Sequence, residues 1–90
     1  MAVVVKFAVS GMSASKYDAV ISQLEASGAG APPGRLHHVS YGSHDSLQVI
    51  DIFDSHESLE NFGKTLVPIL QAAGVTAQPD VHEVYKIIKG

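Results

Sequence analysis

The chain has no cysteine and no tryptophan, and it carries a single arginine among its 90 residues. The absence of cysteine excludes disulfides, thiolate metal sites and cysteine nucleophiles. Six basic residues against nine acidic ones give a formal net charge of −3, so the chain has no basic patch for a nucleic-acid backbone. No apolar run approaches the ~20 residues that span a bilayer, and the first residues lack the pattern of a secretion signal. We therefore expect a cytoplasmic protein that binds neither nucleic acid nor membrane.

Apolar residues, in contrast, are plentiful: 46% of the chain is hydrophobic and only 17% is charged. The low charged fraction, against a norm of about 25%, predicts that part of the surface is apolar and meets a partner. The length predicts one domain over residues 1–90. A chain of this size buries only ~60–65% of its unfolded surface, so an isolated monomer should be marginally stable.

Hydrophobic periodicity and turn chemistry predict six elements in the order β-α-β-β-α-β. Tyr17, Val20, Ile21 and Leu24 form the apolar stripe of the first helix, and Pro68 should kink or interrupt the second helix, which Gly74 ends. The order is that of a ferredoxin-like α+β fold, a four-stranded antiparallel sheet with both helices on one face. The predicted strands are Ala2–Ser10, Arg35–Tyr41, Leu47–Asp54 and Val81–Lys89, the helices start near Ser13–Asp18 and at Asp54 or Ser55, and Ser27–Gly34 is a loop.

The second face of this sheet should be polar if it meets water, but three strands place apolar residues there. Val4, Ile50, Ile52 and Val84 are examples. A second copy would cover such a face, since symmetric homodimers are the commonest oligomers. We therefore expect a homodimer through the sheet faces, with an unpaired monomer carrying scattered apolar residues as the alternative.

The strongest candidate for chemistry is a pair formed across the predicted hairpin. If the turn centres on His44 and Asp45, the indices of opposed residues sum to 89, and His38 faces Asp51. A carboxylate behind an imidazole fixes the tautomer and strengthens the ring as a proton acceptor, as a general base requires. The alternative is that the two side chains only neutralise each other inside the sheet, because an unpaired buried carboxylate would be costly.

Three aromatic residues, Tyr17, Phe53 and Phe62, are the candidate ligand-binding residues. The Tyr17 hydroxyl could donate a hydrogen bond to a ligand between helices and sheet, whereas a purely core role is the alternative for the phenylalanines. No metal site is expected, because His37 points to the face opposite His38 and the two cannot easily hold one ion.

Several segments of the chain resemble the dimeric α+β barrel superfamily, and within it the antibiotic-biosynthesis-monooxygenase-like domains. The resemblance covers most of the chain from residue 17 onward, and its segments are Pro33–Val39, Val49–Ser55, Leu59–Phe62, Leu66–Leu70 and Gly74. It implies oxygenation or isomerisation of a small aromatic or apolar molecule without a cofactor, for which the predicted cross-strand pair would supply His38 as base and Asp51 as its orienter. The haem-degrading members and the quinone oxygenases use tryptophan in their sites and this chain has none, so no catalytic residue is transferred from them. The alternative is a non-catalytic domain that binds a small ligand or another protein.

Overall fold

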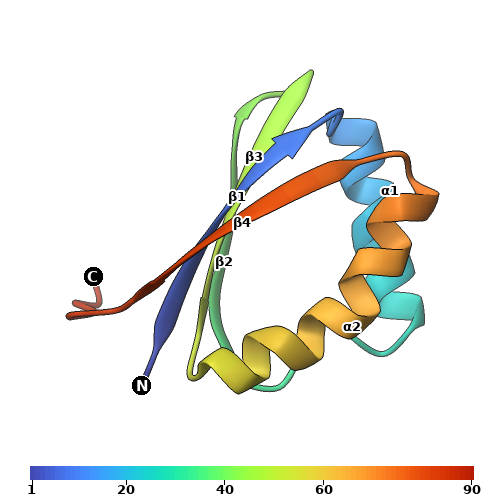
Figure 1. Cartoon of the computed structure of the whole chain (residues 1–90). Coiled ribbons are helices and arrows are strands. Elements are labelled where there is room, and N and C mark those ends of the chain that lie inside the picture. Colours follow the sequence, from blue (N-terminus) through green and yellow to red (C-terminus); the bar gives the residue numbers. More distant parts are fainter.

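A computed structural model describes residues 1–90 and contains two helices packed on one face of a four-stranded sheet (Figure 1). The elements follow the order β-α-β-β-α-β along the chain, as the sequence predicted. Their bounds are β1 Val3–Ser10, α1 Ala14–Ala26, β2 Arg35–Ser43, β3 Ser46–Phe53, α2 His56–Ala72 and β4 Thr76–Glu83.

The sheet has the strand order β2-β3-β1-β4 and all three pairings are antiparallel. The ferredoxin-like α+β architecture is therefore confirmed. The core lies between the helices and the sheet, because alternate residues of β1 and β3 point to the same face. From the sheet it takes Val3, Val5, Phe7, Val9, Leu47, Val49 and Phe53, and from the helices chiefly Val20, Leu24, Leu59, Phe62 and Leu70.

Both helices begin at a serine and end in the same glycine motif. The side chain of Ser13 caps α1 by accepting from the Lys16 amide, two residues earlier than the Ser15–Asp18 signature suggested. Ser55 caps α2, and Gly74 follows α2 with φ +71°, so that the Val75 amide reaches the Leu70 carbonyl. Neither helix is long and apolar enough to cross a membrane.

Two sequence-based predictions about the second half need correction or refinement. Pro68 lies inside α2 without interrupting it, and the helix bends along its length (Figure 1). The last strand is Thr76–Glu83, not Val81–Lys89. Gly74 turns the chain directly onto the edge of β1, so the pairing of β4 with β1 begins at Ser10–Thr76. It stops at Val3–Glu83 because Val3 is the first residue of β1. Residues 84–90 therefore lie beyond the sheet despite their β-branched composition.

Gly34 occupies a position that no other residue can take without strain. Its φ is +85°, and a Cβ there would lie 2.3 Å from Ser58 Oγ and 2.5 Å from Asp54 Oδ1. We expect Gly34→Ala to lower the free energy of unfolding by at least about 2 kcal/mol in urea denaturation, since the left-handed conformation alone costs about 1–2 kcal/mol. The matched control is Gly63→Ala in α2, where a Cβ meets nothing within 4 Å and should stabilise by about 0.5–1 kcal/mol. Equal effects of the two substitutions would contradict this account.

Candidate functional site

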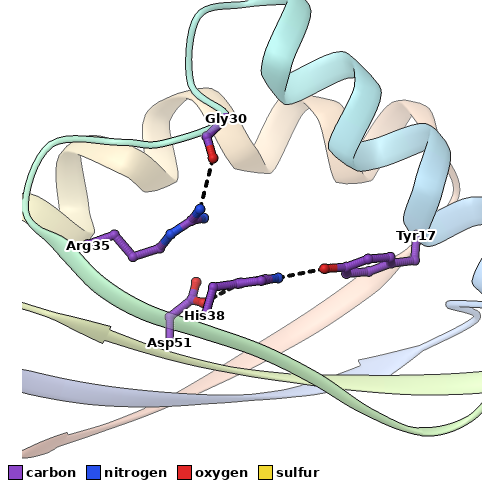
Figure 2. A network of polar contacts seen from close by, with 5 residues as sticks. All are labelled: Tyr17, Gly30, Arg35, His38 and Asp51. Carbon is purple, nitrogen blue, oxygen red and sulfur yellow. Dashed lines mark hydrogen bonds and ion pairs between the residues drawn. The ribbon is translucent and has the colours of Figure 1, made fainter. Parts of the chain in front are cut away.

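Three polar side chains from three elements form a continuous hydrogen-bonded chain beneath the helices (Figure 2). His38 Nδ1 lies 2.5 Å from Asp51 Oδ1, and His38 Nε2 lies 2.7 Å from the Tyr17 hydroxyl. An ionised carboxylate only accepts, so Nδ1 carries the ring proton and Nε2 accepts from the tyrosine. The direction of donation is therefore from Tyr17 to His38 to Asp51.

The register of the hairpin places this pair as the sequence predicted. A two-residue turn at His44 and Asp45 sets β2 against β3, and His38 opposes Asp51. Asp51 is only 2% exposed and the His38 side chain 21% exposed. A carboxylate this deeply buried requires a charge-assisted partner, and His38 is the only side chain that gives it a hydrogen bond.

Tyr17 reaches His38 because α1 begins at Ala14, three residues earlier, so that Tyr17 lies in its first turn. The tyrosine and imidazole rings are stacked, with centroids 6.0 Å apart and planes inclined by 16°. The phenol oxygen is the terminal atom of this hydrogen-bonded chain. A ligand that contacts Tyr17 can therefore exchange a proton with His38 without either ring moving.

Arg35 is a residue of the site that sequence reasoning missed. Residues three apart on a regular strand face opposite sides of a sheet, which would separate Arg35 from His38. A β-bulge between Arg35 and His37 adds Leu36 to the strand, so that Arg35 pairs with Phe53 and His38 with Asp51. Both side chains then face the helices, as Figure 2 shows. The available signal was the position of the only arginine, directly after the Pro33-Gly34 turn.

A small cavity of about 40 Å³, partly open to the surface, lies between the sheet and the helices, with the polar chain in its wall. Its polar lining consists of Tyr17, Arg35, His38 and Asp51. The other lining residues are apolar. A cavity of about 150 Å³ holds benzene. The space beside His38 therefore accommodates water in this conformation, and an aromatic ring requires the wall to move.

A groove of about 480 Å³ lies on the other side of that wall, between α2 and β4. Phe62 and Leu66 of α2 line both spaces, and so do Phe7, Leu70 and Ala77. These shared residues form the wall between the two spaces. Of the two phenylalanines predicted to bind a ligand, only Phe62 lies in this wall. Phe53 is fully buried behind it, with the centroids of the Phe53 and Phe62 rings 5.7 Å apart.

The remaining histidines lie apart from this chain. His37 opposes Ile52 on the other sheet face, His82 pairs with Asp80 at 2.9 Å on the surface, and His56 stands 3.8 Å from Glu60. Nowhere do three histidine, aspartate or glutamate side chains gather in a way that could hold a metal ion.

Solved structures with this arrangement of helices and sheet cover nearly the whole chain. SnoaB, a cofactor-independent oxygenase from Streptomyces nogalater, matches with TM-score 0.62 at 18% identity over 99% of this chain and 96% of its own. The chain has the fold of the antibiotic biosynthesis monooxygenases. A candidate member of that class from Chloroflexus aurantiacus matches with TM-score 0.57 at 18% identity, covering 99% of this chain and 95% of its own.

The same fold occurs in a conserved protein from Methanosarcina mazei, with TM-score 0.64 at 11% identity and 91% coverage of both chains. No family model and no curated protein matches the sequence. At identities of 11 to 18%, these likenesses show a shared fold and no more.

Proposed function

We propose that this chain is a cofactor-independent, monooxygenase-like enzyme that removes a proton from a small aromatic molecule. The observation that carries the proposal is the chain Tyr17–His38–Asp51, with its outer hydroxyl in the wall of an apolar cavity. A hydroxyl on Nε2 and a carboxylate on Nδ1 is the arrangement by which an imidazole accepts a proton and a carboxylate stabilises the resulting imidazolium. The likeness to an oxygenase that needs no cofactor supports this choice of chemistry.

The first step is the same for oxygenation and for isomerisation. The substrate gives its acidic hydrogen to the Tyr17 oxygen while the tyrosine passes its own proton to His38 Nε2. Isomerisation returns the proton to a different carbon. Tyr17 therefore contacts the substrate through its hydroxyl oxygen, His38 is the base, and Asp51 orients His38.

Oxygenation requires O₂ as the second substrate. For a phenol whose keto tautomer carries a CH₂ group, loss of a proton leaves a carbanion that forms a C–O bond with O₂. Return of the proton gives a hydroperoxide, and loss of water from it leaves a second carbonyl. One atom of O₂ enters the product and the other leaves as water. The carbon is oxidised and O₂ reduced, so no further reductant is consumed.

One observation favours the alternative, a domain that binds a small ligand without transforming it. The cavity beside His38 is about 40 Å³, well below the volume of an aromatic ring. In the catalytic proposal the aromatic ring of the substrate lies in the larger groove. The side chains of Phe62 and Leu66, which separate the groove from the cavity, move so that the substrate hydroxyl reaches Tyr17.

The test is consumption of O₂ by the purified protein with a panel of naphthols and polycyclic phenols. The proposal predicts a quinone that carries one oxygen atom from ¹⁸O₂, or an isomer of unchanged mass formed equally under nitrogen. Tight binding of a panel member without either product would instead establish the binding domain. Neither turnover nor binding across the panel would contradict both functions.

We also propose that two copies pair through the open sheet faces. Val39, Ile50 and Ile52 share this face, and Val39 is 51% exposed. The chain exposes 5679 Å², whereas a compact monomer of this mass exposes about 5,000 Å². A partner that covers the apolar face would remove the excess.

Ile50→Lys is expected to convert a dimer into a monomer, because it places a charge at the centre of the proposed interface. Light scattering after gel filtration should give twice the chain mass of 9.5 kDa for the unchanged protein and a single chain mass for the variant. Ser22→Lys, on the exposed outer surface of α1, is the control and should remain dimeric. A monomeric unchanged protein would contradict the proposed interface.

A further inference from the structure

The guanidinium of Arg35 lies at the wall of the inner cavity without a carboxylate partner. It donates one hydrogen bond, from Nη2 to the Gly30 carbonyl at 2.8 Å, and lies 5.9 Å from the centre of the Phe62 ring. The ion pairs of the molecule all involve histidine, so none of them neutralises Arg35. A guanidinium has five N–H donors, and four of them are left for another acceptor.

The backbone is adapted to bring this cation to the cavity. The bulge at Leu36 turns Arg35 to the face that carries His38 and Asp51 (Figure 2). Bulges next to active sites commonly re-aim a side chain in this way. The contacts with Gly30 and Phe62 then hold the guanidinium in place, so little side-chain freedom is left to lose when an anion binds.

Charge within the cavity also favours an anion after proton transfer. Arg35 and Asp51 carry opposite charges before the reaction, and Asp51 Oδ1 is engaged by His38. When His38 accepts a proton, it adds a second positive charge, and the substrate becomes the matching anion. The deprotonated oxygen would then have the Arg35 guanidinium within the same pocket and the imidazolium beyond the Tyr17 hydroxyl. The apolar walls of the pocket strengthen such attraction between opposite charges.

We infer that Arg35 binds the anionic oxygen of the ligand, which makes the preferred ligands phenolates or enolates. This inference rests on the proposed function for its reaction but not for its binding site. It deepens that function by naming the substrate class: aromatic molecules whose hydroxyl is acidic enough to be held as an oxyanion. Charge-assisted bonds from a guanidinium are the strong class of hydrogen bond.

The test compares 4-nitrophenolate with 4-nitroanisole, its uncharged methyl ether, at a pH where the free phenol is mostly ionised. The unchanged protein should bind the phenolate at least about tenfold more tightly than the ether, and Arg35→Gln should lose that preference while binding the ether as before. Arg35→Lys retains the charge and should keep part of the preference. Lys64→Gln, which removes an exposed cation of α2 that lines none of the cavities, is the control.

Two results would overturn the inference: no preference for the phenolate in the unchanged protein, or an equal preference after Arg35→Gln in a folded variant. Either is separable from failure of the proposed function, because the titration requires no turnover. If the protein prefers the phenolate only when Arg35 is present but turns over no substrate, the anion site is supported and only the proposed reaction is contradicted.

Discussion

His38→Asn is expected to lower turnover of an aromatic hydroxyl substrate by about 100- to 10,000-fold while leaving the fold intact. The amide nitrogen of asparagine occupies the position of Nδ1, so it can still donate to Asp51. What the variant lacks is Nε2, the atom that accepts from Tyr17. The measurement is the turnover rate, alongside the free energy of unfolding of the same preparation.

His38→Ala separates the chemical role of the pair from its structural role. This variant removes the base and also leaves Asp51 buried without a donor, which should cost about 1–3 kcal/mol of stability. The catalytic account predicts equal loss of activity in the two variants and loss of stability in the alanine variant alone. A purely structural pair would show the same difference in stability with no loss of turnover in His38→Asn.

Phe53→Ala is expected to lower the free energy of unfolding by about 3–5 kcal/mol. Phe53 is fully buried, and its ring packs against Phe62 beneath the cavity. The total free energy of unfolding of a small domain is about 5–15 kcal/mol. Only 16 of the 90 residues here are buried, so the core has little to spare. The variant should therefore populate the unfolded state in dilute denaturant, as chemical denaturation followed by circular dichroism would show.

Phe53→Leu decides whether this residue supports the core or touches the ligand. Leucine keeps most of the buried apolar volume, so the variant should lose about 1 kcal/mol and remain folded. Because Phe53 does not line the cavity, its affinity for 4-nitrophenolate should stay within about twofold of the unchanged protein. A tenfold loss of affinity in this folded variant would place Phe53 in contact with the ligand.

The order of elements and the His38–Asp51 register could be predicted because both follow from local rules. Hydrophobic periodicity and turn chemistry specified the elements, and the two-residue turn at His44 and Asp45 fixed the pairing of β2 with β3. The contact between Tyr17 and His38 needed one further fact, the starting point of α1. Ser13 rather than Ser15 sets that point, and serine at either position is a favourable N-cap residue.

The end of β4 and the role of Arg35 could not be read from the same rules. Residues 84–90 have strand composition, but a strand requires a partner, and β1 begins only at Val3, which pairs with Glu83. Arg35 shares a face with His38 only because of the bulge at Leu36, which breaks the period of two on which strand predictions depend. Both are consequences of pairing between distant segments rather than of the residues themselves.

The measurement that tests the central claim most directly is a crystal structure of the protein with bound 4-nitrophenolate. Our account predicts the phenolate oxygen within hydrogen-bond distance of the Tyr17 hydroxyl, with the Arg35 guanidinium on its other side and Phe62 or Leu66 displaced to admit the ring. A ligand bound elsewhere, with the Tyr17–His38–Asp51 chain closed beneath an unchanged cavity, would contradict it.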